Sequence, residues 1–432
     1  MILLKNGQVY LSDKKKFEKA DVLIDKKIVK KIAPNIEESK AEILDCTDKH
    51  IFPGFVDLHC HLRDPGYTYK EDIASGAVSA AKGGFTSICC MPNTNPVIDN
   101  VSTLNYLMRK ARDVGKTKIF VIGAMSKGLE GKEIANIASL VKSGVVGLSD
   151  DGNCIQNAKL QLNVMRYGSI YDIPMICHSE DYSLSGDGQV NYGFISTKLG
   201  LPGIPTLAEE IMVSRDIMLA DVTGTHVHIA HVSTKRTVEL IRQAKKDGIR
   251  VTAEVTPHHL VLTEQACEGF DTTTKMKPPL RSEKDRKSLI EGLLDDTIDV
   301  IATDHAPHSD YEKELEFIKA PYGVIGFESA FPVVYTELVK KGIISLELLI
   351  DKMTARPAEI IKREVGMIKE GSSADINVFD LKESFIFDEN EILSKSKNSP
   401  FLGRELTGRI FCTFCDGKVI WEKSNAVQKA PN

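Results

Sequence analysis

The sequence has no apolar run long enough to cross a membrane and no excess of positive charge. A helical membrane span needs about 20 consecutive apolar residues, so we expect a soluble protein without membrane contact. The 55 lysines and arginines are outnumbered by 60 aspartates and glutamates, for a formal net charge of −5. This balance argues against a nucleic-acid partner. The N-terminal MILLKNGQVY has the pattern of a short strand rather than a signal peptide, which predicts a cytoplasmic location.

The nine cysteines lack the pattern of a disulfide framework, because their number is odd and they are scattered along 432 residues. Several lie in apolar, strand-like runs, where cysteine acts as a small hydrophobic residue. Cys412 and Cys415 form a single CxxC. Without a second pair this is weak evidence for zinc or redox chemistry, and the alternation around it favours a β-strand.

No internal repeat or low-complexity tract is present, and the middle of the chain alternates strand-like and helix-like segments. Amphipathic stretches at 71–84, 102–115 and 233–248 have helical periodicity. Eight apolar, β-rich runs occur, at 51–59, 85–91, 118–124, 145–149, 173–179, 226–232, 249–257 and 299–305. Eight strand-plus-helix units within about 300 residues predict an α/β fold, a (β/α)₈ TIM-type barrel.

The two ends of the chain differ from its middle, because both contain short alternating strands with turn signals. We therefore expect residues 1–52 and 367–432 to form one composite small β-domain, a β-sandwich, beside a barrel of residues 53–366. The last nine residues, SNAVQKAPN, have the composition of a polar tail.

The HCH triplet at 59–61 is the sharpest chemical signal. Residues i and i+2 of a strand share a face, so His59 and His61 project together while Cys60 points away. Two imidazoles on one rigid face form half of a divalent-metal site. Arg63 would place a forked, carboxylate-binding cation at its edge. An isolated HxH can also be two packed, hydrogen-bonded histidines, so the metal interpretation depends on further ligands.

Further metal-type side chains follow other predicted strands. In a (β/α)₈ barrel the catalytic groups come from the carboxyl ends of the strands, which meet at one rim. The candidates at this rim are His59, His61, Asp151, His178, His231 and Asp304. One four-coordinate zinc cannot use all six and keep an open position. The set therefore predicts two metals that share a bridging carboxylate, with water or hydroxide between them. Manganese or cobalt would suit the same ligands.

Other histidines have weaker cases. His226 and His228 are out of phase with His231, which predicts core or ligand-supporting roles. His258 and His259 follow the seventh strand and are candidates for orienting the ligands. We expect His305 to be structural.

Four motifs together resemble the dihydroorotase family of the amidohydrolase superfamily. They are FPGFVDLHCHLRDPG at 52–66, GLSDDG at 147–152, ATDHAPH at 302–308 and GFESAFP at 326–332. The resemblance covers essentially the whole chain and is strongest to the long bacterial type, whose metals are bridged by an aspartate. The related hydantoinases and allantoinases bridge their metals with a carboxylated lysine after strand four, where this chain has Ser149-Asp150-Asp151.

The resemblance implies a role for each candidate residue. His59, His61 and Asp304 would bind one metal, with zinc expected, and His178 and His231 the other, while Asp151 bridges the two. The substrate carboxylate and ring would be held by Arg63, Asn93, His308 and the backbone near Tyr322 and Gly323.

One position departs from the family pattern. Lys277 of KMKPPLR stands where the family has an asparagine that contacts the pyrimidine ring. A lysine can donate hydrogen bonds but not accept them. Lys277 either donates a hydrogen bond to the ring in place of the asparagine, or it points away and another group makes that contact.

The implied activity is the reversible cyclisation of N-carbamoyl-L-aspartate to L-dihydroorotate and water, a step of de novo pyrimidine biosynthesis. A metal-bridging hydroxide would attack the ring carbonyl, and Asp304 would carry the proton as acid and base. The alternatives are another cyclic amidohydrolase, like hydantoinase or allantoinase, and a non-catalytic scaffold. The resemblance is compatible with a homodimer and with association with aspartate carbamoyltransferase.

Overall fold

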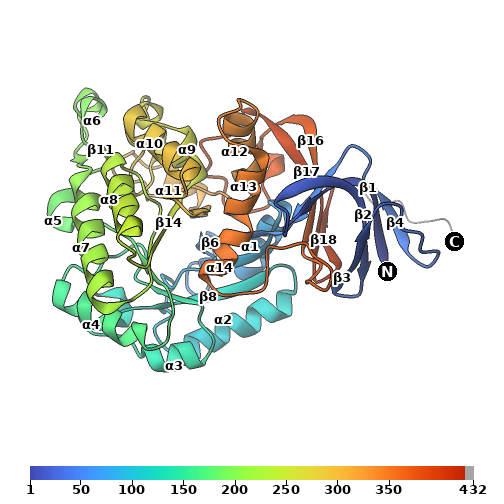
Figure 1. Cartoon of the computed structure of the whole chain (residues 1–432). Helices are drawn as coiled ribbons and strands as arrows, with labels where there is room; N and C mark the ends of the chain where they lie inside the picture. Colours follow the sequence, from blue (N-terminus) through green and yellow to red (C-terminus); the bar gives the residue numbers. More distant parts are fainter. Residues whose placement is uncertain (424–432) are drawn as a thin grey trace.

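A parallel, eight-stranded barrel forms the larger part of the computed structural model, which describes residues 1–423 (Figure 1). Its strands follow one another in chain order: β6 (Phe55–Cys60), β7 (Phe85–Cys90), β8 (Lys118–Ala124), β9 (Gly147–Ser149), β10 (Met175–Cys177), β13 (Val227–Ile229), β14 (Val251–Val255) and β15 (Val300–Ile301). A parallel bridge between Cys60 and His305 closes the ring beyond β15. Each strand overlaps one of the eight predicted runs, so the (β/α)₈ prediction is confirmed.

The helices of the described chain are α1 (Ile73–Lys82), α2 (Val101–Val114), α3 (Ile137–Lys142), α4 (Ala158–Ser169), α5 (Tyr182–Ser185), α6 (Phe194–Leu199), α7 (Leu207–Thr223), α8 (Lys235–Lys246), α9 (Pro257–Val261), α10 (Glu283–Leu294), α11 (Asp310–Lys313), α12 (Ala330–Val334), α13 (Leu346–Met353) and α14 (Ala355–Ile360). Longer helices such as α2, α4, α7 and α8 cover the outside of the barrel (Figure 1). Within residues 1–423, no helix combines the length and apolar character of a bilayer span.

The predicted helices at 71–84, 102–115 and 233–248 correspond to α1, α2 and α8. Helix α8 shows which features of the sequence made these helices predictable. The Thr234 side chain caps its first turn by accepting from the Thr237 amide, and Val238, Ile241 and Ala244 form its buried stripe.

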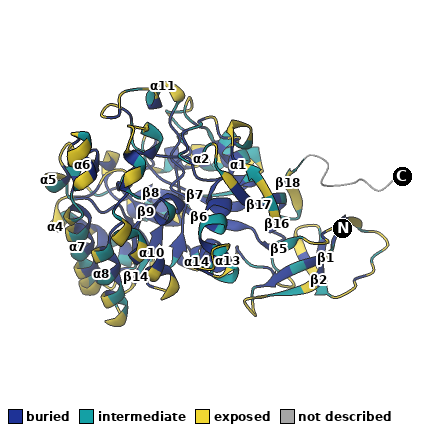
Figure 2. Ribbon diagram, turned by 90° about the horizontal axis from the view of Figure 1, so that it is seen from above, coloured by how far each residue is buried: buried dark blue, intermediate teal, exposed yellow. Residues whose placement is uncertain are grey.

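The barrel strands are buried on both faces, as Figure 2 shows by their dark colour. Val56, Leu58 and Ile176 pack in the interior with Ile360 of α14, whereas a second apolar cluster fills the space between strands and outer helices. Cys60 belongs to the outer cluster, so it points away from the barrel mouth, as predicted. Strands buried on both sides are expected to be continuous hydrophobic runs, which is what the sequence shows.

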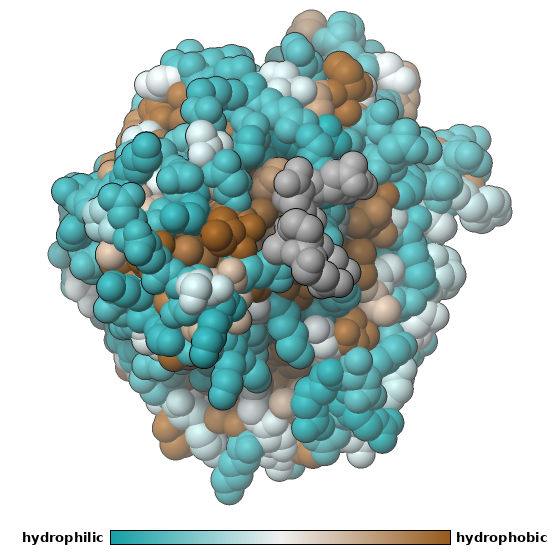
Figure 3. Space-filling model, turned by 90° about the vertical axis from the view of Figure 1, so that its right-hand side faces the viewer, coloured by the Kyte–Doolittle hydropathy of each residue, from teal (hydrophilic) through white to brown (hydrophobic). Residues whose placement is uncertain are grey.

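The two ends of the chain meet in a second, eight-stranded sheet beside the barrel (Figure 1). Its strands are β1 (Ile2–Leu11), β2 (Lys16–Asp25), β3 (Ile28–Ala33), β4 (Glu42–Asp45), β5 (His50–Pro53), β16 (Ile376–Ile386), β17 (Glu405–Cys415) and β18 (Lys418–Glu422). The antiparallel pairing of β5 with β16 joins the N-terminal and C-terminal strands. Viewed from the side of this sheet, the surface is mostly hydrophilic with scattered apolar patches (Figure 3).

The domain boundaries given above stay a prediction, and the predicted polar tail at 424–432 lies outside the described residues. Cys412 and Cys415 lie in β17 and are buried and free, in agreement with the predicted strand. A remaining pair of short strands, β11 (Val190–Asn191) and β12 (Gly203–Ile204), lies in the segment between β10 and α7.

The single strand predicted for 51–59 is wrong, because the structure divides it between the two sheets. Strand β5 pairs with β1 and β16, whereas β6 pairs with β7 of the barrel. The division falls at Gly54, whose amide donates to the Asp375 carbonyl at 2.9 Å. A Cβ at Gly54 would collide with the Thr86 side chain, so the close approach requires glycine. The apolar run at 51–59 gave no sign of the position at which the chain passes from one sheet to the other.

Candidate metal centre and substrate pocket

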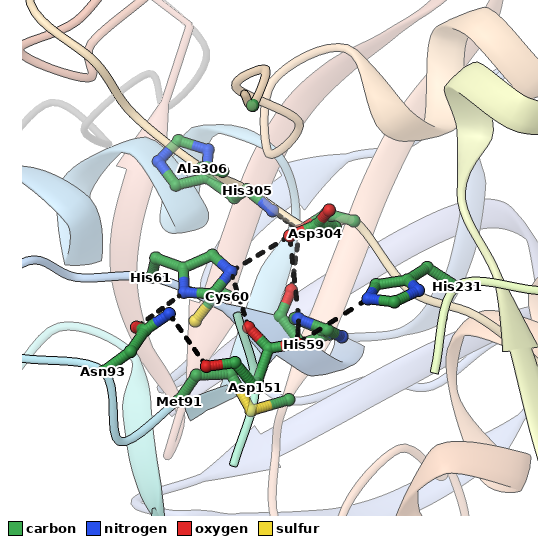
Figure 4. A network of polar contacts seen from close by, with 12 residues as sticks. His59, Cys60, His61, Met91, Asn93, Asp151, His231, Asp304, His305 and Ala306 are labelled. Atoms are coloured by element: carbon green, nitrogen blue, oxygen red, sulfur yellow. Dashed lines mark hydrogen bonds and ion pairs between the residues drawn. The ribbon is translucent and has the colours of Figure 1, made fainter. Parts of the chain in front are cut away.

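The barrel rim brings together all six residues predicted as metal ligands (Figure 4 labels all of them except His178). His59 lies in β6, and the other five follow the ends of β6, β9, β10, β13 and β15 within a few residues. All six are buried; they are His59, His61, Asp151, His178, His231 and Asp304. Because these strands are parallel, their carboxyl ends share one edge of the barrel, which explains the convergence.

The first half of the cluster contains both histidines of the HCH triplet. His59 Nε2 lies 3.2 Å from Asp151 Oδ1, and His61 Nε2 lies 3.6 Å from Asp151 Oδ2. Asp304 Oδ1 is 3.0 Å from His61 Nε2 and 3.6 Å from His59 Nε2. Two imidazoles and two carboxylates therefore face one another, and they include the three side chains that the resemblance assigns to the first metal.

The second half shares Asp151 with the first. Asp151 Oδ1 is 3.6 Å from His231 Nε2 and 3.8 Å from His178 Nδ1. The two imidazoles are 2.9 Å apart between His178 Nδ1 and His231 Nε2. The ligand-type atoms of His59, His61 and Asp151 lie within 4.8 Å of one another, and so do those of Asp151, His178 and His231. Asp151 is thus the one carboxylate common to both halves.

The donor set suits a pair of divalent cations. Imidazole nitrogens and carboxylate oxygens are the usual ligands of zinc and of neighbouring transition metals. His59 Nε2 and Asp151 Oδ1 are buried, and neither has a partner with hydrogen-bond geometry among residues 1–423. Unsatisfied buried polar atoms are rare in native proteins, so these two point to a missing partner such as a metal ion.

The backbone is unusual at three of the site residues. Arg63, His231 and Asp304 have φ angles of 60°, 34° and 46°. Non-glycine residues seldom adopt this left-handed region, and such strain persists where the surrounding structure enforces it. Two of these residues are predicted metal ligands and the third is the predicted substrate cation, so the strained positions coincide with the candidate site.

The electrostatics favour ionised carboxylates. Burial alone would raise the pKa of Asp151, but the charge on His59 and the close contacts with His231 and His59 outweigh it and hold that pKa well below its usual range. The pKa of Asp304 is also lowered, because His59 and His61 outweigh burial. Ionised carboxylates are the metal-binding form.

Glu254 is a functional residue that the sequence analysis missed. Its Oε1 lies 2.6 Å from His59 Nδ1 and its Oε2 lies 3.1 Å from His228 Nε2. The positive charges of His59 and His228, together with their hydrogen bonds to Glu254, outweigh the effect of burial and lower the pKa of Glu254 to about 2. The carboxylate therefore orients His59, and the supporting role predicted for His228 is consistent with this contact. A single acidic residue in the apolar run 249–257 was the signal that could have identified it.

Two further aspartates fix the loops that carry the ligands. Asp150 Oδ1 accepts from the amides of Met125 and Ser126 at 2.8 and 2.9 Å, which ties the end of β8 to the residue before Asp151. Asp57 accepts from the Thr303 amide at 2.9 Å, which ties β6 to the residue before Asp304. Neither role was predicted.

A cavity of about 270 Å³ opens beside the metal-type cluster. It is lined by all six predicted substrate residues, namely Arg63, Asn93, Lys277, His308, Tyr322 and Gly323. Asn93 has a second function, because its Oδ1 lies 3.0 Å from His61 Nδ1 and its Nδ2 donates to the Asp151 carbonyl at 3.4 Å. It therefore links the pocket wall to two predicted ligands.

His308 and Arg63 lie together on one side of this pocket. The Lys70 ammonium is 3.2 Å from His308 Nδ1, and the Tyr322 carbonyl is 2.8 Å from Nε2. Burial and the charge of Arg63 hold the pKa of His308 well below its usual range, so the ring is neutral. Arg63 Nε donates to the Pro307 carbonyl at 3.2 Å. The rest of the guanidinium lines the cavity.

Two buried lysines hold the substrate-facing segment 320–323. Lys275 Nζ donates to the Ala320 carbonyl at 2.6 Å, and Lys313 Nζ donates to the Pro321 carbonyl at 2.8 Å. Each ammonium makes further hydrogen bonds to carbonyls, and neither has a carboxylate partner within residues 1–423. Buried lysines without a counter-charge are uncommon, so this arrangement is a specific feature of the pocket wall.

Lys277, the departure from the family pattern, faces an acidic partner. Its Nζ lies 2.8 Å from Glu180 Oε1 and 5.1 Å from the centre of the Tyr322 ring. The other carboxylate oxygen, Glu180 Oε2, is 3.3 Å from His178 Nε2. Lys277 is therefore connected through Glu180 to a predicted metal ligand.

His259, predicted as a candidate for orienting the ligands, instead contacts residues outside the metal-type cluster, and His305 packs against an aromatic ring. His259 Nδ1 lies 2.7 Å from Thr256 Oγ1, and its Nε2 lies 3.0 Å from the Pro278 carbonyl. The ring of His305 stacks on Phe327 at a centroid distance of 4.0 Å, in agreement with its predicted role.

Comparison with known proteins identifies the relatives of this chain. A family model described as "Dihydro-orotase-like" matches residues 48–237. The chain is 47% identical over 419 residues to the dihydroorotase of Acetivibrio thermocellus, covering 97% of this chain and 98% of the relative. It is 48% identical over 428 residues to the dihydroorotase of Thermoanaerobacter sp., covering 99% of both chains.

Solved structures agree on the fold. The L-hydantoinase (dihydropyrimidinase) of Arthrobacter aurescens superposes with a TM-score of 0.88 and 25% identity, over 99% of this chain and 97% of that one. A D-hydantoinase from a Bacillus sp. gives a TM-score of 0.86 at 24% identity, over 100% and 97% of the two chains. The barrel with its accompanying sheet is thus shared across these proteins.

Proposed function

Since the chain belongs to the dihydroorotase family of the amidohydrolase superfamily, and is a hydrolase acting on a cyclic amide, we propose that the rim cavity is its active site. The reaction is the reversible cyclisation of N-carbamoyl-L-aspartate to L-dihydroorotate and water, a step of de novo pyrimidine biosynthesis. The observation that carries the assignment is a cluster of two imidazole pairs around Asp151, with Arg63 on the wall of the same cavity.

Two divalent metal ions, zinc in our proposal, would complete this site. His59, His61 and Asp304 would hold one ion and His178 and His231 the other, with Asp151 shared. The shared carboxylate, the buried atoms without partners and the nitrogen and oxygen donors support this assignment. When bound, such a pair supplies Lewis acidity and an activated water.

Asp304 is the proton carrier in this proposal. Its carboxylate lines the cavity and lies beside His61, whose charge helps to keep it ionised. In hydrolysis it accepts a proton from the attacking water and delivers it to the departing ring nitrogen. In cyclisation the protonated carboxyl assists the departure of water as the ureido nitrogen closes on the side-chain carboxylate. A positioned carboxylate of this kind contributes roughly 10²- to 10⁴-fold in rate.

Arg63, Asn93, His308 and the backbone at Tyr322 and Gly323 hold the substrate in this proposal. The guanidinium can pair with the substrate carboxylate through two parallel hydrogen bonds. Because the pocket wall at 320–323 is fixed by Lys275 and Lys313, its backbone groups are already oriented before substrate arrives.

We propose a cytoplasmic protein, and nine free, buried cysteines support a reducing compartment. A homodimer and an association with aspartate carbamoyltransferase rest on the family resemblance. Size-exclusion chromatography with light scattering, with and without the transferase, tests both.

The decisive experiment measures dihydroorotate hydrolysis and metal content of the purified chain before and after chelation. We expect about two zinc ions per chain, loss of activity with chelator and recovery with added zinc. Asp151→Asn should lose most of both ions, whereas Asp113→Asn, at an exposed position of α2, should retain both. Full activity with one ion per chain would contradict the shared-carboxylate arrangement.

A further inference from the structure

Lys277 has a partner that the family comparison does not suggest. We propose that Lys277 is a positioning residue for the His178–His231 half of the metal centre, acting through Glu180, and is not a ligand of the substrate. The inference rests on the proposed metal centre and concerns a residue at which this chain departs from the family pattern.

The geometry directs the Lys277 ammonium away from open solvent and toward one carboxylate. Its Nζ lies 2.8 Å from Glu180 Oε1, and the exposed fractions of the two side chains are 27% and 8%. The ammonium also lies over the Tyr322 ring at 5.1 Å, a favourable contact for a cation. Lys277 therefore forms part of the cavity wall, while its charge is engaged by Glu180 and Tyr322.

Glu180 requires this positive charge. It is buried, and its Oε1 makes no other polar contact within the described residues apart from the ion pair with Lys277. A buried carboxylate without a counter-charge is strongly unfavourable. A neutral asparagine at position 277 could not supply that charge, so the lysine and the buried carboxylate belong together.

Glu180 in turn contacts the outer nitrogen of His178, the ring nitrogen that faces away from the metal-type cluster. His178 Nδ1 faces the metal-type cluster at 2.9 Å from His231 Nε2, whereas Nε2 lies 3.3 Å from Glu180 Oε2. A metal-binding histidine commonly donates its second N–H to a carboxylate, which fixes the ring orientation and strengthens the ligand. Lys277, Glu180 and His178 thus form a chain from the cavity wall to the metal centre.

The contrast with Glu254 supports this interpretation. Both carboxylates face the outer nitrogen of a predicted ligand, Glu254 at His59 and Glu180 at His178. The other carboxylate oxygen of Glu254 contacts His228, and the other carboxylate oxygen of Glu180 contacts Lys277. Each half of the centre therefore has one supporting carboxylate that is itself held by a second side chain.

The test compares metal affinity with substrate affinity in the zinc-loaded full chain. Variants Lys277→Met, Lys277→Arg, Glu180→Gln and the double variant Lys277→Met/Glu180→Gln are titrated with a chromogenic zinc chelator in the absence of substrate. Lys198→Met is the matched control, because Lys198 makes a comparable ion pair with Glu268 at the surface. Michaelis constants for dihydroorotate are measured in parallel, and circular dichroism reports folding.

We expect Glu180→Gln to weaken the binding of one of the two zinc ions about 10- to 100-fold. Lys277→Met should weaken the same ion by about threefold or more. The double variant should be no weaker than Glu180→Gln alone, because both changes interrupt one chain. The Michaelis constant of Lys277→Met should stay within about twofold, and Lys277→Arg should retain both properties.

Three results would overturn the inference. One is a Michaelis constant raised about tenfold in Lys277→Met with unchanged zinc affinity, which would make Lys277 a substrate ligand. The second is additive loss of zinc affinity in the double variant, and the third is no change in either quantity. Failure of the proposed metal centre is a separate outcome, because the unmodified chain would then bind no pair of zinc ions.

Discussion

His59 and Glu254 are 195 residues apart in the sequence, yet His59 Nδ1 lies 2.6 Å from Glu254 Oε1 in the barrel interior. The opposite nitrogen, His59 Nε2, faces Asp151 at 3.2 Å. One imidazole therefore connects the metal-type cluster to a carboxylate on β14. Glu254 is therefore part of the site through its contact with His59. It does not line the cavity and has no hydrogen bond to Asp151 within residues 1–423.

Replacing Glu254 tests this connection. In Glu254→Gln the amide keeps the size of the side chain but loses the charge that holds His59 and His228. We expect zinc affinity or turnover to fall about 10- to 100-fold. Zinc content and dihydroorotate hydrolysis are measured together, with Glu291→Gln at an exposed position of α10 as the control. Unchanged zinc content and turnover would show that His59 is oriented by other contacts.

Asp304→Asn separates metal binding from proton transfer. The amide oxygen can still serve as a ligand, but it cannot accept the proton. We expect turnover in both directions to fall at least about 10²-fold, with zinc content largely retained and Asp113→Asn unaffected. Because hydrolysis needs the ionised carboxylate and cyclisation the protonated form, the wild-type rates should rise with pH in hydrolysis and fall with pH in cyclisation. Near-normal turnover of the variant, or parallel pH profiles, would assign the proton to another group.

Arg63→Met tests substrate choice. Dihydroorotate carries a carboxylate that dihydrouracil lacks, and buried donors left unpaired reject the wrong ligand by factors that can reach about 10⁴. We expect the unmodified chain to prefer dihydroorotate strongly and the variant to lose most of that preference through slower dihydroorotate hydrolysis alone. Rates on both substrates are compared, with Arg109→Met on the exposed surface of α2 as the control. Equal rates with the unmodified chain would indicate hydantoinase-like specificity.

Lys313 gives a prediction for the pH dependence of stability. Burial and the charge of Lys275 lower its pKa from 10.5 to about 7. Between these two pH values the unfolded chain binds a proton that the folded chain lacks, so this group makes stability increase with pH. Lys313→Met removes that contribution. Its urea midpoint should therefore fall progressively below that of the unmodified chain from pH 7 to pH 10.

The size of the Lys313 effect has an upper bound of about 1.4 kcal/mol per pH unit for one proton. The exposed Lys319, in the same segment, provides the control variant Lys319→Met, for which no such pH-dependent difference is expected. A midpoint difference between Lys313→Met and the unmodified chain that stays constant with pH would show that Lys313 keeps its proton throughout.

The sequence was sufficient for the barrel and for the metal-type cluster. Local patterns determine both, since apolar runs alternate with helical stripes and the ligand-type residues follow the strand ends directly. The HCH triplet illustrates this, because the two-residue period of a strand places His59 and His61 together whatever the rest of the chain does. The convergence of Asp151, His178 and Asp304 then follows from the parallel topology.

Only the tertiary structure decided which distant side chains support that cluster. Glu254 lies 195 residues from His59, so their contact depends on the pairing of distant strands. Glu180 follows His178 by two residues but lies in the loop between β10 and α5, and no periodic pattern of the sequence determines the conformation of that loop. The same holds for Lys275 and Lys313, whose partners are carbonyls, which every residue carries and which leave no trace in the sequence. Lys277 departs from the family pattern in the sequence, but only the tertiary structure places its ammonium beside Glu180.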